Sequence, residues 1–235
     1  MEEKIVLISG ANSGIGRVAA IQLAKRGNIV VMLCRDKDRG EKALTEIKKI
    51  SNNNKVYLML CDLSSFSDIR RFCSEFKKRF TRLDVLVNNA GTMNYERVES
   101  IDGFELHLHV NYLAPYLLTN LLLDCINQEG RIINVTSIAH KTGTINLDDP
   151  NLTKGFSMFK AYSQSKLALV LFTYELARRL KDKGIAVNCV HPGVIISNLG
   201  VYKEKRIINY LTSKLKWLFC SEEKGAKPLV YLADS

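Results

Sequence analysis

Short runs of hydrophobic, largely β-branched residues alternate along this chain with amphipathic segments of helical length. The runs are KIVLIS (4–9), NIVVMLC (28–34), KVYLML (55–60), LDVLVN (83–88), RIINVTS (131–137) and IAVNCV (185–190). Their hydrophobicity is continuous, which is typical of strands covered on both faces in a parallel sheet. With right-handed β-α-β crossovers, the pattern predicts an α/β fold: one doubly wound, Rossmann-like parallel sheet with helices on both faces.

The chain has 235 residues, a length that suits one domain, and no internal repeat or low-complexity tract suggests a second. We therefore expect a single Rossmann-type domain over residues 1–235. A strand begins almost at once and no apolar run reaches about 18 residues, so we expect neither a signal peptide nor a membrane span. Six cysteines without a Cys-x-x-Cys pair are typical of reduced packing residues in a cytoplasmic protein.

The formal net charge of +10 attracts polyanions, anionic membrane surfaces or a phosphate-rich small molecule. The basic residues are scattered along the predicted helices without interleaved aromatic residues, which indicates solvated helix faces and argues against nucleic acid as a partner. Four histidines are present, but His107 and His109 are two apart and point to different sides of a helix. We expect no metal site.

A glycine-rich turn follows the first predicted strand and opens a helix. Gly10, Gly14 and Gly16 have the spacing G-x-x-x-G-x-G. Glycines let the backbone turn tightly and approach a pyrophosphate, which the free N–H groups of the helix N-terminus bind. Such a turn alone is weak evidence, but its position between a first strand and a helix favours a dinucleotide site.

The end of the second predicted strand carries Arg35. NAD-binding sheets have a carboxylate near this point that accepts from the ribose 2′-OH. A cation suits a 2′-phosphate instead, through charge-assisted N–H bonds, so the sequence favours NADP(H) over NAD(H). The alternative is that Arg35 forms a surface ion pair with Asp36 or Asp38.

Two further strand ends offer residues to the adenosine half of such a cofactor. Asp62, beside Leu63, follows the third strand, and its carboxylate can accept from the adenine amino group. The NNAG stretch after the fourth strand, with Asn88, Ala90 and Gly91, offers a floor of small residues. Each of these stretches is equally typical of an ordinary turn.

The chemical residues lie in the second half of the chain. Ser137 ends the fifth predicted strand, and Tyr162 and Lys166 are four apart on a predicted helix, so they share a face. Alone, such a pair is typical of a solvated helix face. A phenol with a pKa of about 10 is a poor acid-base group at neutral pH. A neighbouring ammonium together with a positive nicotinamide would lower that pKa, while Ser137 could hold a carbonyl oxygen by a hydrogen bond.

The stretch HVNYLAPYLLTN (109–120) has the apolar spacing of a packed helix, with Pro115 in its middle. Proline lacks an N–H and crowds the carbonyl of residue i−4, here Asn111, so we expect a disrupted helix. One interpretation is a kink that fits local packing. The other is that the freed carbonyl of Asn111 binds a water that relays protons from solvent through Lys166 to Tyr162.

In order and spacing, these motifs resemble the short-chain dehydrogenases/reductases over nearly the whole chain. The matching stretches are Ser9 to Gly16, NNAG (88–91), Asn111, Ser137, Tyr162 with Lys166, and HPGVIIS (191–197). The resemblance implies Tyr162 as the acid-base group, Lys166 and Asn111 as a proton relay, and Ser137 as the substrate holder. It also implies the strand order 3-2-1-4-5-6, followed in relatives by a seventh strand that we expect to be missing here, since the sequence ends at Ser235.

The resemblance adds residues to the expected cofactor site. They are Asn12, Ser13 and Ile15 of the glycine-rich turn, Tyr162 and Lys166, and, over the nicotinamide carboxamide, Pro192, Gly193, Ile195 and Ser197. The stretches INLDDPNL (145–152) and HPGVIISNL (191–199) look most like the NADP-dependent retinol dehydrogenase branch. That branch implies a lipophilic aldehyde, ketone or alcohol as substrate. The alternative is a catalytically idle NADP(H)-binding regulatory protein of the same fold.

Residues 195–220 occupy the place of the family's variable substrate flap. Within them, the apolar positions of 201–219 follow a helical pattern opposite several lysines. The segment either packs on the domain or forms a lid that also touches an anionic membrane surface, such as that of the endoplasmic reticulum. Relatives often pair through the two long helices, so a homodimer is compatible with the sequence.

Overall fold

Six parallel strands form one sheet in the order β3-β2-β1-β4-β5-β6. The protein is seen in a computed structural model that describes residues 3–193 and 220–235. The strands are β1 (Ile5–Ser9), β2 (Ile29–Cys34), β3 (Val56–Leu60), β4 (Leu83–Asn88), β5 (Ile126–Val135) and β6 (Ala186–Val190). The order and the parallel pairing confirm the predicted Rossmann-like sheet. Ile195, Ser197 and the flap segment 195–219 lie outside the described residues.

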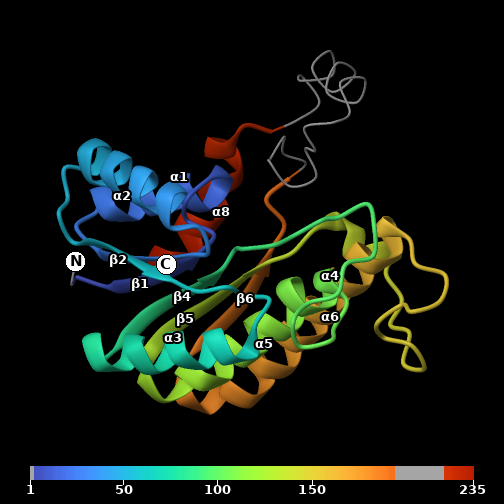
Figure 1. Cartoon of the computed structure of the whole chain (residues 1–235). Helices are drawn as coiled ribbons and strands as arrows, with labels where there is room; N and C mark the ends of the chain where they lie inside the picture. The colour runs from blue at the N-terminus through green and yellow to red at the C-terminus, as the bar shows by residue number, and fades with distance from the viewer. Residues whose placement is uncertain (1–2, 194–219) are drawn as a thin grey trace.

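Helices cover both faces of this sheet (Figure 1). On one face lie α1 (Gly14–Lys25), α2 (Lys37–Ser51) and α8 (Glu222–Asp234), and on the other α3 (Phe66–Arg79), α5 (Ala114–Leu122) and α6 (Met158–Leu180). Successive strand residues point to opposite faces, so Val6 and Ile8 of β1 join one core while Ile5 and Leu7 join the other. Both faces of β1 are therefore buried, which is why its run is continuously hydrophobic.

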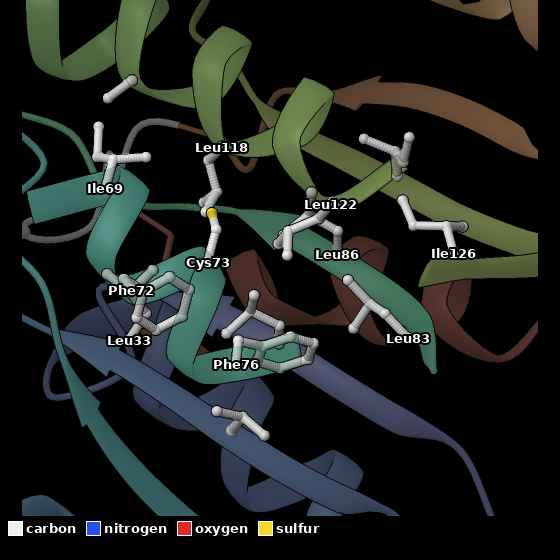
Figure 2. Close-up of a cluster of buried hydrophobic side chains, with 14 of the residues drawn as sticks. Leu33, Ile69, Phe72, Cys73, Phe76, Leu83, Leu86, Leu118, Leu122 and Ile126 are labelled. Carbon is white, nitrogen blue, oxygen red and sulfur yellow. The ribbon is translucent and has the colours of Figure 1, made fainter. Parts of the chain in front are cut away.

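The larger core lies between the sheet and helices α3, α5 and α6 (Figure 2). Phe72 and Phe76 of α3 are four apart and pack between Leu118 of α5 and the strands. Both rings are completely buried, and each contributes about 1.5–3 kcal/mol by leaving water. Ser65 caps the N-terminus of α3, because its side chain accepts a hydrogen bond from the backbone N–H of Asp68.

The stretch around Pro115 is disrupted as predicted, in the form of a π-helical turn. After the short helix α4 (Leu106–Leu108), the π-helix η1 covers His109–Leu113, and α5 begins at Ala114. Pro115 therefore lies in the first turn of α5, directly after the π turn, so its missing N–H falls where the hydrogen-bond pattern changes; the N–H of Ala114, just before it, donates to the carbonyl of His109. Such π turns are frequent at functional sites. The relay through the carbonyl of Asn111 stays a prediction.

The expectation that the cysteines are packing residues is confirmed for three of the six, whereas Cys220 is exposed. All six cysteines are free thiols, and Cys34, Cys61 and Cys73 are buried among hydrophobic side chains. None of the helices in residues 3–193 and 220–235 combines the length and the hydrophobicity that crossing a bilayer demands. The same residues contain no group of three or more His, Cys, Asp or Glu side chains arranged to hold a metal ion.

Candidate active site

The glycine-rich turn connects β1 to α1 at the carboxyl edge of the sheet. Gly10 and Gly14 have φ of +68° and +59°, a region that disfavours other residues. Gly16 is required by space, since a Cβ atom there would lie 2.4 Å from Nδ2 of Asn89 and 2.5 Å from the carbonyl oxygen of Gly10. No side chain can fill this cradle without displacing the backbone around it.

The N-terminus of α1 fits a bound phosphate. Ser13 is the N-cap residue, and its side chain makes no capping hydrogen bond, so the first backbone N–H groups of α1 are left for another acceptor. Asn12, Ser13 and Gly14 are all partly exposed beside this N-terminus, while Ile15 packs against the core on the α1 side. The cradle and the uncapped N–H groups thus suit the pyrophosphate of a dinucleotide.

Arg35 and Asp62 lie at the ends of neighbouring strands on the same edge. The side chain of Arg35 is exposed and has no hydrogen bond or ion pair with any part of the chain described here. Asp36 instead caps α2, accepting from the backbone N–H of Arg39 at 2.9 Å. The Oδ1 atom of Asp62 accepts from the backbone N–H and the hydroxyl of Ser64 at 2.9 and 2.7 Å, and the neighbouring Leu63 is buried.

The two asparagines of NNAG have separate roles. The Asn88 side chain is buried and donates to Thr119 Oγ1 and Asn134 Oδ1, at 3.1 and 2.8 Å, so it faces the core and not the cofactor cradle. Asn89, which the sequence analysis did not single out, donates through Nδ2 to the carbonyl of Ser9 at 2.8 Å. It thereby holds the glycine-rich turn in place. The sequence signal that could have identified Asn89 was the pair of adjacent asparagines in NNAG.

Three catalytic candidates meet where β5 ends. Ser137 begins the short turn after β5, and Tyr162 and Lys166 project from α6. Lys166 Nζ donates to the carbonyl of Val135 at 2.9 Å and lies 5.7 Å from the centroid of the Tyr162 ring. Lys166 is only 4 % exposed, which excludes the alternative of a solvated helix face.

The loop after β4 completes the site from the other side. A Cβ atom on Gly91 would lie 3.2 Å from Oδ1 of Asn111 and 3.6 Å from Lys166 Nζ. Asn111 is fully buried, accepts from the backbone N–H of Thr92 at 2.8 Å, and donates to Thr92 O and Ser165 Oγ at 3.1 and 3.0 Å. The π turn thus connects the loop after β4 to α6 through one side chain. Nothing in the sequence pointed to Thr92.

Burial controls the protonation of the two central groups. It lowers the pKa of Lys166 from 10.5 to about 8, because the desolvated amine loses part of its preference for the charged form. Burial also raises the pKa of Tyr162, and a hydrogen bond with Ser137 offsets this only in part. Lys166 is not among the causes of this shift. The lowering expected from Lys166 together with a positive nicotinamide stays a prediction.

The stretch after β6 begins beside the end of β5. The backbone N–H of Thr136 donates to the carbonyl of Val190 at 2.9 Å, so the two strand ends lie side by side. Pro192 is partly exposed, and Gly193 has a φ of +90°. The predicted contact of these two residues with the nicotinamide stays a prediction.

Comparison with known proteins identifies the arrangement. Residues 4–208 match the family model described as short chain dehydrogenase. The chain belongs to the short chain dehydrogenase family. It is an oxidoreductase whose fold implies a nicotinamide cofactor, in agreement with the glycine cradle and the uncapped helix.

Relatives of this short chain dehydrogenase confirm the branch as well as the family. Retinol dehydrogenase 13 of Homo sapiens is 41% identical over 237 residues, which cover 98% of this chain and 72% of that protein. Retinol dehydrogenase 11 of Homo sapiens is 43% identical over 232 residues, covering 98% and 72%. A solved structure of the Pseudomonas aeruginosa RhlG/NADP active-site complex superposes with a TM-score of 0.77 at 26% identity, covering 98% of this chain and 89% of that one.

Proposed function

We propose that this short chain dehydrogenase transfers hydride between NADP(H) and a lipophilic aldehyde or ketone, or the corresponding alcohol. The observation that carries the proposal is the meeting of Ser137, Tyr162, Lys166 and Asn111 at one edge of the sheet, beside the glycine-rich turn. A protein that only bound the cofactor would not need a buried lysine and an acid-base phenol on one helix face.

The nicotinamide, when bound, supplies or takes up the hydride. The hydroxyl of Ser137 holds the substrate oxygen by a hydrogen bond, and the phenol of Tyr162 gives that oxygen its proton during reduction. Burial raises the pKa of Tyr162, so the phenol carries a proton at neutral pH, which suits the reductive direction. The pKa of Lys166, about 8, lies close enough to neutral pH for the amine to exchange protons.

The preference for NADP(H) is supported by Arg35. Its side chain is exposed at the end of β2, is not bonded within the described chain, and can therefore bind a 2′-phosphate. The RhlG structure, whose description names NADP, is a further support. We expect Arg35→Ala to weaken NADPH binding about 10- to 100-fold, the effect of losing hydrogen bonds to a charged group, with little change for NADH.

The cofactor test is a titration of both cofactors by fluorescence. Lys42→Ala, an exposed cation on α2, serves as the matched control and should leave both dissociation constants unchanged. Tighter binding of NADH than of NADPH by the unmodified protein would refute the proposed preference.

A lipophilic substrate is supported by apolar side chains around the catalytic group. Ile138 directly follows Ser137, Phe159 lies one helical turn before Tyr162, and both are exposed. The names of the relatives point to retinoids as one such substrate. We expect NADPH to be consumed with retinaldehyde or other lipophilic aldehydes or ketones, and Tyr162→Phe to abolish this. Tight NADPH binding without any turnover would favour the regulatory alternative.

Two associations are part of the proposal. Exposed Tyr116 of α5, and Leu171 and Tyr174 of α6, support a homodimer through these helices, which light scattering would detect as twice the monomer mass.

The net charge of +10 and the amphipathic pattern of 201–219 support peripheral contact with an anionic membrane, such as the endoplasmic reticulum. If the protein sediments with liposomes equally well with and without residues 201–219, the proposed membrane contact is refuted.

A further inference from the structure

A buried acid–histidine pair lies next to the catalytic tyrosine. Glu105 and His107 are 1 % and 0 % exposed, and the rings of His107 and Tyr162 meet edge to face with centroids 6.4 Å apart. The ring of Phe156 lies near the same histidine, at 6.2 Å. None of the roles assigned above to the catalytic side chains uses this pair.

The hydrogen bonds of His107 determine which of its nitrogens carries the proton. The backbone N–H of Asn94 donates to Nε2 at 2.8 Å, so Nε2 is an acceptor and bears no proton. The proton is then on Nδ1, which donates to Oε1 of Glu105 at 2.5 Å. The imidazole is neutral and its tautomer is held by Glu105.

Glu105 is itself fixed. Its carboxylate accepts from the backbone N–H groups of His107 and Leu108 at 3.1 and 2.9 Å, which caps α4. Burial acts to raise the pKa of Glu105, but these bonds and the one from the His107 ring lower it overall. The lowered pKa favours the ionised carboxylate, which orients the histidine through this hydrogen bond.

Two buried side chains, four residues apart, hold the loop after β4. Asn111 binds the backbone of Thr92 on both its N–H and its carbonyl, and His107 binds the N–H of Asn94. Gly91 directly precedes Thr92, and a Cβ atom there would lie 3.2 Å from Asn111 Oδ1 and 3.6 Å from Lys166 Nζ. A shift of the loop would therefore displace Asn111 and Lys166, the residues proposed for the proton relay.

We propose that His107, oriented by Glu105, is a positioning residue that holds the 92–94 loop and the ring of Tyr162 in register for proton transfer. The inference rests on the proposed function. Displacements of about 1 Å at a reacting group can cost about 100-fold in rate, so the effect should fall on kcat more than on cofactor binding.

The test compares His107→Gln with His107→Phe. Glutamine can accept from Asn94 and donate to Glu105, whereas phenylalanine keeps a ring against Tyr162 but makes neither hydrogen bond. We expect His107→Phe to lower kcat about 10- to 100-fold, with the dissociation constant of NADPH changed less than about threefold. Hydrogen exchange of the 92–94 amides should become about tenfold faster. His107→Gln should restore both quantities to within about fivefold of the unmodified protein.

Glu105→Gln is the second variant, should His107→Phe fail to fold. The amide keeps one acceptor oxygen but turns a donor toward the backbone N–H of Leu108. Hydrogen exchange of the 92–94 amides should therefore become faster and kcat should fall, each by less than in His107→Phe. Ser100→Ala is the matched control: its hydroxyl bonds to Nδ1 of His109 at 2.7 Å and accepts from the backbone N–H of Phe104 at 3.2 Å, but it makes no hydrogen bond to His107 or to residues 92–94, so both readouts should stay unchanged.

Two results would overturn the positioning role: unchanged exchange of the 92–94 amides in folded His107→Phe, or a His107→Gln protein as impaired as His107→Phe. The exchange measurement needs no turnover. If the unmodified protein binds NADPH but reduces no carbonyl, the proposed function fails, while the exchange rates still decide whether His107 holds the loop.

Discussion

Replacement of Lys166 by methionine should stabilise the folded protein at pH 7 while abolishing turnover. The folded protein binds the Lys166 proton more weakly than the unfolded chain does, since burial lowers the pKa from 10.5 to about 8. Stability therefore rises with pH between these two values, and the penalty for the buried charge is fully present below about pH 8. Methionine has a similar length and no charge, so it removes this penalty.

The size of the effect follows from the pKa difference and one hydrogen bond. At pH 7 the protonation penalty is about 3 kcal/mol, because a tenfold change in proton affinity corresponds to about 1.4 kcal/mol. Losing the hydrogen bond from Lys166 to the Val135 carbonyl costs about 1 kcal/mol. The net gain is then about 2 kcal/mol at pH 7. At pH 10 the penalty falls to about 1 kcal/mol, so the gain should vanish.

Urea unfolding of both proteins at pH 7 and pH 10 measures this difference. Lys160→Met, in the first turn of the same helix but exposed, is the control and should show no pH-dependent change in relative stability. A Lys166→Met protein that is less stable than the unmodified one, by the same amount at both pH values, would refute the reasoning. NADPH binding without aldehyde reduction would complete the expected result.

Three further substitutions test the fold around the site. Gly16→Ala should weaken NADPH binding and lower stability by about 1–3 kcal/mol, because its Cβ would overlap Nδ2 of Asn89; fluorescence titration and thermal melts measure both effects. Phe76→Ala should cost about 3–5 kcal/mol in the free energy of unfolding, since the ring is completely buried between α3 and the sheet. Ser157→Ala should cost about 1 kcal/mol in urea unfolding, because its hydroxyl caps α6 by accepting from the N–H of Lys160.

Local patterns determined most of the architecture. All six strands lie within or overlap the predicted hydrophobic runs, because a strand buried on both faces needs apolar residues at every position. The glycine-rich turn could equally be recognised from the sequence, since glycine adopts the positive φ of Gly10 and Gly14 at far less cost than other residues. The helical spacing of Tyr162 and Lys166 placed both on one face, and Pro115 marked the disrupted turn.

What each candidate side chain does was decided by residues distant in the chain. Asn88 and Asn89 are adjacent, yet one bonds to α5 and β5 while the other holds the glycine-rich turn. The hydrogen bond between His107 and Asn94 and the proximity of Gly91 to Lys166 exist only once β4 lies beside β5 and α6. Protonation followed the same rule: the pKa values of Lys166 and Tyr162 depend on desolvation, and desolvation depends on everything that packs around a group. Periodicity along a chain records which face of an element is covered, but not which side chains meet there.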